Sequence, residues 1–293
     1  MPDMPRLDLL EDLGGRGPML HLAHANGFPP GTYRLLAHAL GARHHVVALP
    51  ARPLWPGSSP GDAPTWRTMA GDLLRVIEAL APNGIVAVGH SLGGVLTLWA
   101  AVERPDLFRA VILIDPVILP PHWLLALRLA RAVGMHSRTP LVRSTLRRRR
   151  NWPDEQACFD HYRRKPLFAR WSDEALWDYV RAATRKVSGG LVLRYPPEWE
   201  AHIFATVPTG IWRDVPHLRV PCLVLRGEHS ETFVPGALSR MARLLPGARF
   251  ATLPGAGHLL PMECPSQTAA AILDFLTNWE EGGTMGVRGG GGT

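Results

Sequence analysis

Two residues of this sequence, a serine and a histidine, lie in loops of the kind that supports nucleophilic catalysis. Ser91 is at the centre of residues 89–93, GHSLG, which match the pattern G-x-S-x-G. His258 follows the tripeptide Gly-Ala-Gly late in the sequence. A serine hydroxyl becomes a strong nucleophile when an adjacent base takes its proton, and histidine is the most common base. The pair therefore predicts acyl-transfer chemistry.

The segments on both sides of Ser91 predict the turn that such a serine needs. Residues 84–89 form a short run rich in Val and Ile, which is typical of a buried strand, and a helix is expected over 93–102. A sharp strand-to-helix turn lifts the serine oxygen above the sheet. We expect any side chain at the two glycine positions of this motif to collide with neighbouring backbone.

Strand-like and helix-like segments alternate over most of the chain. Strands are predicted over 19–23, 45–49, 110–114, 222–225 and 249–253, and helices over 32–40, 66–80, 234–245 and 267–279. This alternation predicts an α/β fold with a mostly parallel central sheet flanked by helices. It stops between 117 and 213, which we interpret as an inserted, mainly helical cap. The core then comprises residues 1–116 and 214–281, followed by a Gly-rich flexible tail, 282–293.

Several motifs resemble those of the α/β-hydrolase family. Residues 89–94, GHSLGG, resemble its nucleophile elbow, and 253–258, LPGAGH, resemble its catalytic-histidine loop. Residues 225–231, LRGEHSE, resemble its acid loop, so the order serine, acid, histidine is also that of the family. The segments HANGFP (24–29) and RPLWPG (52–57) resemble a group of bacterial hydrolases. The resemblance implies a Ser-His-acid triad, with Ser91 as nucleophile and His258 as base.

The acid of this triad is open to three assignments. We prefer Glu231, which aligns with a position where the family often has Asp. Asp115, at the carboxyl end of the strand predicted over 110–114, is the alternative, because some members of the family carry the acid there. Glu228 is a third choice. The resemblance also implies an oxyanion hole made by the amides of Phe28 and Leu92.

Charge is concentrated in the predicted cap. The net charge of the chain is +7, but residues 117–213 contain 17 basic and eight acidic residues, a net +9. We interpret this excess mainly as a solvated surface. Steering of anionic substrates or peripheral membrane contact through the Arg-rich cap is the less favoured interpretation, and no motif for nucleic-acid binding is found.

Features that would place the chain in a membrane or an oxidising compartment are not found in the sequence. We find no secretory signal and no apolar run long enough to span a bilayer, so we expect a soluble cytoplasmic protein. Cys158, Cys222 and Cys264 lie far apart and are expected to be reduced. No cofactor or metal site is predicted, and the oligomeric state is not indicated.

Together these features predict a serine hydrolase that cleaves a carboxylic ester of a small, largely apolar acyl substrate. The apolar preference rests on six tryptophans within the predicted cap, which we expect to line a pocket. Thioester, lactone or carbon–carbon bond cleavage, acyl transfer to another acceptor, and ligand binding without turnover remain alternatives. Serine at the elbow argues against the haloalkane dehalogenase and epoxide hydrolase branches of the family, which have Asp there.

Overall fold

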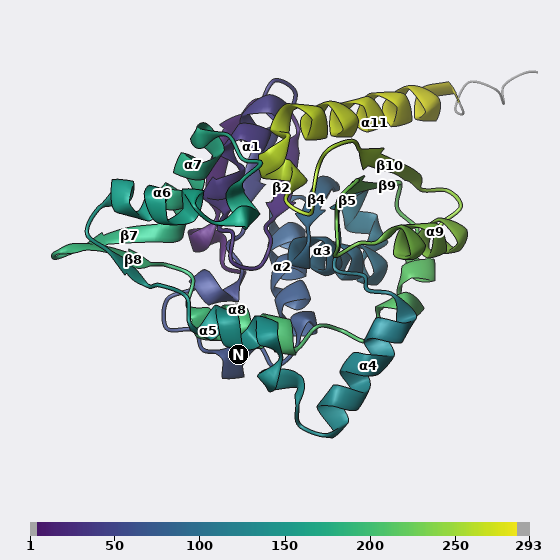
Figure 1. Cartoon of the computed structure of the whole chain (residues 1–293). Coiled ribbons are helices and arrows are strands. Elements are labelled where there is room, and N and C mark those ends of the chain that lie inside the picture. The colour runs from purple at the N-terminus through teal and green to yellow at the C-terminus, as the bar shows by residue number, and fades with distance from the viewer. Residues whose placement is uncertain (1–4, 286–293) are drawn as a thin grey trace, which may run out of the picture.

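The computed structural model describes residues 5–285 and shows a seven-stranded sheet at the centre of the molecule (Figure 1). The strand order is β1-β3-β2-β4-β5-β9-β10. The edge strand β1 is antiparallel to β3, and all other neighbouring pairs are parallel. The strands are β1 (Glu11–Gly15), β2 (Met19–Ala23), β3 (His45–Ala48), β4 (Ile85–His90), β5 (Phe108–Ile114), β9 (Cys222–Gly227) and β10 (Arg249–Leu253).

Helices cover both faces of this sheet, so its central strands are largely apolar. Along β5, Val111 and Leu113 pack into one core with α2 (Trp66–Leu80), α3 (Leu92–Glu103) and α9 (Pro235–Leu244). Ala110, Ile112 and Ile114 pack into a second core with α1 (Arg34–Leu40), α10 (Leu260–Glu263) and α11 (Pro265–Met285). Successive side chains of a strand point to opposite faces, so a strand between two helical layers is apolar at most positions.

The predicted α/β-hydrolase fold is confirmed, and two features of the core differ from the expectation. The edge strand β1, which is polar, Gly-rich and only partly buried, was not predicted because it lacks the apolar run of a buried strand. The tail was expected to begin at Gly282, but α11 continues to Met285. The rest of that predicted tail, 286–293, lies outside the described residues.

The segment interpreted as a cap contains five helices and a small sheet. The helices are α4 (Pro121–Ala132), α5 (Pro140–Leu146), α6 (Glu155–Arg163), α7 (Asp173–Ala183) and α8 (Pro197–Ala205). The antiparallel sheet has the order β6 (Asn151–Trp152), β8 (Gly190–Leu193), β7 (Thr184–Val187). This sheet was not predicted, because its strands are too short to show a period. Its hairpin turns at Gly189 and Gly190, which both have positive φ.

Tryptophans of this segment pack into the two hydrophobic cores that flank the central sheet. Trp152, Trp171 and Trp199 are almost completely buried, whereas Trp123 lies exposed on the outside of α4. They therefore do not support the predicted pocket lined by six indole rings. None of the helices formed by residues 5–285 is long and apolar enough to cross a membrane.

Candidate active site

Ser91 lies on a strained turn between β4 and α3. Its backbone has φ 55° and ψ −113°, a conformation that side-chain-bearing residues rarely adopt. Its amide donates to the carbonyl of Ile114 on the neighbouring strand (3.0 Å), which helps to hold this conformation. Such strain is typical of a functional position, because only surrounding structure can maintain it.

The two glycines of the GHSLG motif allow this turn to form. A Cβ on Gly89 would lie 2.4 Å from the Gly93 carbonyl oxygen, and one on Gly93 would lie 2.0 Å from the carbonyl oxygen of Ala23. Both obstacles are backbone atoms, which cannot move aside as a flexible side chain can. The collision expected from the sequence is confirmed.

We therefore expect Gly93→Ala to destabilise the fold by about 3 kcal/mol or more, since it forces β2 away from the elbow. Gly236→Ala is a matched control, because Gly236 also lies in a helix and its Cβ would meet no heavy atom within 4 Å. That control should change stability by less than about 1 kcal/mol. Urea unfolding of both variants checks the prediction, and equal stability of the two would contradict it.

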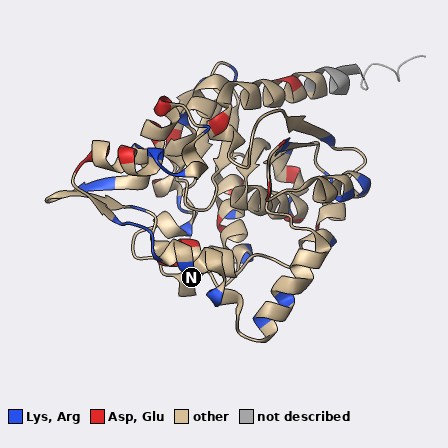
Figure 2. Cartoon of the chain, viewed as in Figure 1, with Lys and Arg blue, Asp and Glu red and all other residues tan. Residues whose placement is uncertain are grey.

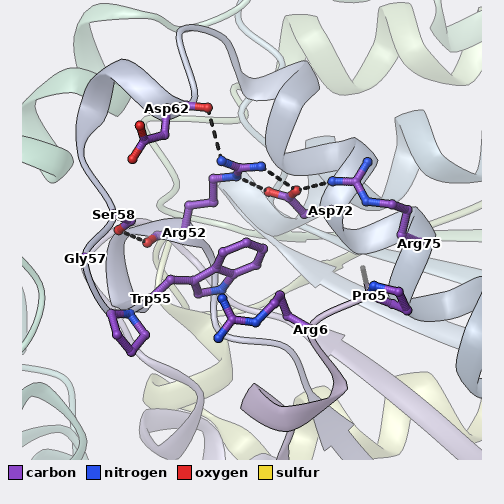
Figure 3. Close-up of a pocket in the computed structure, with 10 residues that line it drawn as sticks. Pro5, Arg6, Arg52, Trp55, Gly57, Ser58, Asp62, Asp72 and Arg75 are labelled. Carbon is purple, nitrogen blue, oxygen red and sulfur yellow. Dashed lines mark hydrogen bonds and ion pairs between the residues drawn. The ribbon is translucent and has the colours of Figure 1, made fainter. Parts of the chain in front are cut away.

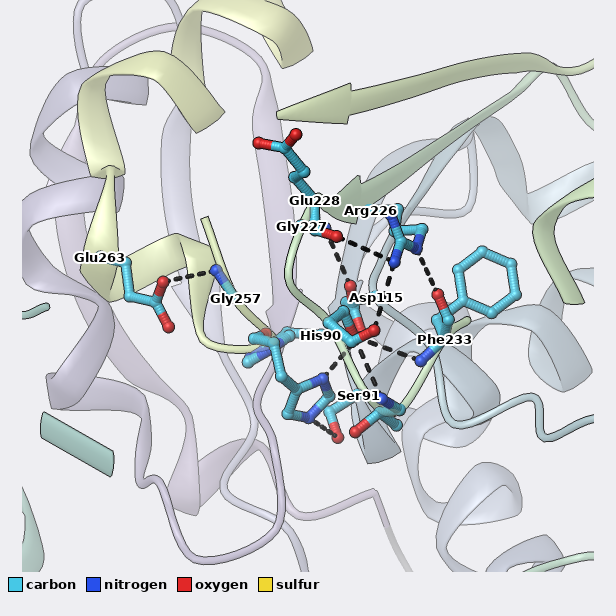
Figure 4. A network of polar contacts seen from close by, with 12 residues as sticks. His90, Ser91, Asp115, Arg226, Gly227, Glu228, Phe233, Gly257 and Glu263 are labelled. Carbon is cyan, nitrogen blue, oxygen red and sulfur yellow. Dashed lines mark hydrogen bonds and ion pairs between the residues drawn. The ribbon is translucent and has the colours of Figure 1, made fainter. Parts of the chain in front are cut away.

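A continuous hydrogen-bonded chain joins Ser91, His258 and Asp115 (Figure 4). His258 lies in the loop after β10, and its Nε2 is 3.0 Å from Ser91 Oγ. Its Nδ1 is 2.8 Å from Asp115 Oδ1. Because a carboxylate only accepts, Nδ1–H donates to Asp115 and Nε2 is left to accept the serine proton. This is the geometry that a general base requires.

Asp115 is fully buried directly after β5 and is held by three donors. Besides His258, its Oδ1 accepts from the Ser230 hydroxyl (2.6 Å), and its Oδ2 accepts from the Gly227 amide (3.0 Å). The backbone of Asp115 has φ 42°, a second strained position beside the first. These donors satisfy both oxygens of the buried carboxylate and fix its orientation.

Of the three carboxylates considered as the acid, only Asp115 lies beside His258 in the described structure. Glu231 is exposed, and among residues 5–285 no hydrogen bond or ion pair joins it to His258. Glu228 is also exposed, and its carboxylate accepts from the Gly255 amide (2.8 Å). The residue of this loop that points inward is Ser230, which reaches Asp115 instead of the imidazole. The loop that resembles the family's acid loop therefore contacts Asp115 through Ser230, and its own Glu231 does not reach His258.

The loop after β9 is held in place by a buried arginine. Arg226 donates to the carbonyl oxygens of Phe233 (2.6 Å), Glu228 (3.1 Å) and Ser230 (3.2 Å). Ser230 Oγ in turn accepts from the amide of Phe233 (3.2 Å). These contacts fix the hydroxyl that faces Asp115. The predicted acid loop, LRGEHSE, contains both Arg226 and Ser230, but neither was singled out.

A second series of buried hydrogen bonds lies behind His258. The Ala25 amide donates to Tyr33 Oη (2.9 Å), which lies 2.7 Å from His90 Nδ1, and His90 Nε2 lies 2.9 Å from the His258 carbonyl. A carbonyl only accepts, so Nε2 carries the proton of His90 and Tyr33 donates to Nδ1. Burial lowers the pKa of His90 well below its ordinary value, which keeps this imidazole neutral. These hydrogen bonds link the loop after β2 to the loop that carries His258.

With this geometry in view, the chain can be compared with known proteins. A model of the alpha/beta hydrolase family matches residues 22–271. The chain belongs to the alpha/beta hydrolase family.

Two curated relatives and one solved structure illustrate the range of this similarity. A 2-(acetamidomethylene)succinate hydrolase of Mesorhizobium japonicum is 26% identical over 94% of this chain and 93% of its own length. A polyketide synthase of Burkholderia thailandensis is 27% identical over 94% of this chain, but this chain spans only 12% of that protein. The crystal structure of E-2-(acetamidomethylene)succinate hydrolase has a TM-score of 0.75 at 23% identity and covers 92% of this chain and 94% of its own. The relatives thus include hydrolases.

The two amides predicted to form the oxyanion hole differ in their availability. Leu92 is the first residue of α3, and the first amides of a helix have no acceptor within it. The Phe28 amide donates to the Ala25 carbonyl (3.2 Å), which closes a turn through Gly27 at φ 80°. In this hydrolase Phe28 can serve an oxyanion only by sharing its proton with that carbonyl, as bifurcated hydrogen bonds do.

Residues of the segment 117–213 hold the loop that carries Phe28. Asn26 Nδ2 donates to the Glu200 carbonyl (3.1 Å), and Tyr195 donates to Asn26 Oδ1 (2.9 Å). The Glu200 side chain forms a largely buried ion pair with Arg148, and a Cβ on Gly27 would meet that carboxylate at 3.0 Å. Arg148, from the Arg-rich run 147–150, is therefore part of the protein interior and is not a solvated residue.

The RPLWPG segment lines a surface cavity away from the candidate active site (Figure 3). The cavity has a volume of about 200 Å³, and none of the residues lining it belongs to the group Ser91, His258 and Asp115. Arg52 is paired there with buried Asp72 by two contacts of 2.5 and 2.9 Å. This ion pair joins the loop after β3 to α2, so we assign the segment a structural role.

Proposed function

We propose that this chain is a serine hydrolase that cleaves an acyl bond through an acyl-enzyme intermediate. The observation that carries the proposal is the hydrogen-bonded order Ser91, His258, Asp115 on a strained elbow. In this proposal Ser91 is the nucleophile, His258 is the base, and Asp115 replaces Glu231 as the acid.

The first half of the reaction follows from the hydrogen bonds. His258 Nε2 accepts the proton as Ser91 Oγ attacks the substrate carbonyl carbon, and the imidazolium that forms is stabilised by Asp115. The Leu92 amide, with the shared Phe28 amide, donates to the oxygen that becomes negative. His258 then gives its proton to the leaving group, and water releases the acyl group by the same steps.

The surroundings of Ser91 favour a neutral, largely apolar ester. Val117, whose amide contacts the Ser91 carbonyl oxygen at 3.4 Å, and Phe28, whose amide is the predicted oxyanion donor, are both apolar and partly exposed. Arg148 is the cap arginine that lies against the Phe28 loop, and its charge is offset by Glu200. An anionic substrate would therefore gain little from it.

The free thiols support a cytoplasmic location. Cys158, Cys222 and Cys264 are all unpaired with one another, as expected in a reducing compartment. Burial raises the pKa of the Cys158 and Cys222 thiols to about 12, so they lack the thiolate character of reactive cysteines.

We expect hydrolysis of p-nitrophenyl esters, with kcat/KM for a neutral ester at high salt at least equal to that for an anionic ester of the same size. Any anionic advantage at low salt should be less than about fivefold and should vanish at high salt, because it comes from exposed arginines. The rates at which acyl-CoAs and lactones are hydrolysed, measured alongside, test the thioesterase and lactonase alternatives. A large anionic preference that survives high salt would place an arginine in contact with substrate and contradict the apolar site.

A further inference from the structure

The segment from Val117 to Arg150 combines exposed apolar side chains with unbalanced positive charge. Nine large apolar side chains are exposed among the described residues, and seven of them lie in this segment: Trp123, Leu125, Leu129, Val133, Met135, Leu141 and Leu146. The segment also contains eight arginines and no Asp or Glu. We call this the α4–α5 surface, after the two helices that carry it.

The apolar side of α4 faces away from the protein. Leu125, Leu129 and Val133 are spaced by four residues, so they line one face, and each is more than half exposed. Leu124 is the one residue of α4 that is buried. In Figure 1 this helix projects beside the main body of the molecule.

Contacts on its inner side fix α4 in this orientation. Arg128 donates to the Thr209 carbonyl (2.5 Å), and Arg131 donates to the Ala205 carbonyl at the end of α8 (3.2 Å). Trp212 donates to the Leu119 carbonyl just before α4 (2.8 Å). Because the inner side is held in this way, the exposed stripe is a defined face of the folded protein.

Other arginines of the surface remain available to an outside partner. Arg138, Arg143 and Arg147 are exposed, and within residues 5–285 no carboxylate forms an ion pair with any of them. Figure 2 shows only basic positions along α4 and no acidic ones. The patch is therefore complementary in charge to an anionic partner.

We propose that the α4–α5 surface docks onto an anionic phospholipid membrane. Aliphatic side chains need an apolar medium and arginines need anionic acceptors, and a lipid surface offers both at adjacent depths. Trp123 is a tryptophan, a residue type that is enriched at the boundary between the apolar interior of a membrane and its headgroups. A second copy of the chain fits less well, because a two-fold contact through this face would bring its arginines against each other.

Sedimentation of the full chain with vesicles tests this proposal. We expect binding to vesicles of phosphatidylcholine with about one third phosphatidylglycerol, and little binding to pure phosphatidylcholine. Leu125→Ser with Leu129→Ser should weaken binding at least about tenfold. Leu167→Ser, which alters an exposed leucine elsewhere in the cap, should leave it unchanged.

The contribution of the arginines to binding is tested by the same vesicle sedimentation. Arg138→Gln and Arg143→Gln should each weaken binding about fivefold, whereas Arg185→Gln, on β7, should not. Ser91→Ala should bind as the wild type does, so the result does not depend on hydrolysis. The leucine variants should keep wild-type kcat/KM on a soluble ester, which shows that they fold.

Three results would overturn the proposal. The first is no sedimentation with anionic vesicles at low salt. The second is equal binding by the wild type and the Leu125→Ser, Leu129→Ser variant, because apolar insertion would then be absent. The third is a dimer in analytical ultracentrifugation that this double variant converts to monomer, which would identify a second copy as the partner.

Discussion

Ser91→Ala and His258→Ala should each reduce kcat for ester hydrolysis by about 10⁶-fold, close to the level that removal of both would reach. Triad members act as a unit, so the loss of either one removes the activated nucleophile. The structure supports this coupling, since one hydrogen bond of 3.0 Å joins the two side chains. A fluorophosphonate probe should label the wild type at Ser91 and should fail to label either variant.

The same variants should retain the fold. His258 is anchored by its backbone, because its carbonyl accepts from His90 Nε2 whatever the side chain is. Ser91→Ala keeps the backbone hydrogen bond to Ile114, although the positive φ remains strained. Melting temperatures near that of the wild type confirm that lost activity is chemical. Turnover within tenfold of the wild type in either folded variant would refute the serine-hydrolase mechanism.

The turn that carries Ser91 could be predicted from the sequence because its constraints are local. Ser91 needs glycines two residues before and after it, and the structure shows backbone atoms within 2.4 Å of where their Cβ atoms would be. The strand and the helix on either side of Ser91, β4 and α3, are long enough to show their periods. Elsewhere in the fold, α2 and β10 have the predicted limits. Local sterics and periodicity therefore fix this part of the site.

The carboxylate that lies beside His258 could not be identified from the sequence, because its environment is built from distant segments. Asp115 accepts from Gly227, Ser230 and His258, which lie more than a hundred residues later in the chain. A sequence gives no sign of which carboxyl group will collect these donors. Glu231 matched the position where the family often has Asp, but its side chain is exposed.

The contribution of the Arg-rich run was also beyond sequence reasoning. Four consecutive arginines suggest a solvated surface, yet Arg148 is mostly buried beside Glu200 and donates to Tyr179 (2.8 Å). A helix end can send neighbouring side chains in opposite directions, so one residue of a charged run reaches the interior. What it meets there depends on α7 and α8, which are far away in sequence.

The hydrogen bonds around Asp115 determine what its replacement should do. In Asp115→Asn, an amide nitrogen takes the place of one carboxylate oxygen and becomes a donor. If it replaces Oδ1, it faces His258 Nδ1 and forces the imidazole to accept there. His258 Nε2 then carries the proton and cannot take one from Ser91. If it replaces Oδ2 instead, it faces the Gly227 amide, and two N–H donors then oppose each other without an acceptor.

We therefore expect Asp115→Asn to lower kcat by about 10⁴-fold while the protein stays folded, and Glu231→Gln to change kcat less than about threefold. Glu231→Gln is the matched control, because it makes the same chemical change in an exposed side chain. Steady-state kinetics and melting curves of both variants provide the measurement. A loss of a hundredfold or more in Glu231→Gln would restore Glu231 as the acid, because an exposed residue outside the relay has no structural route to such an effect.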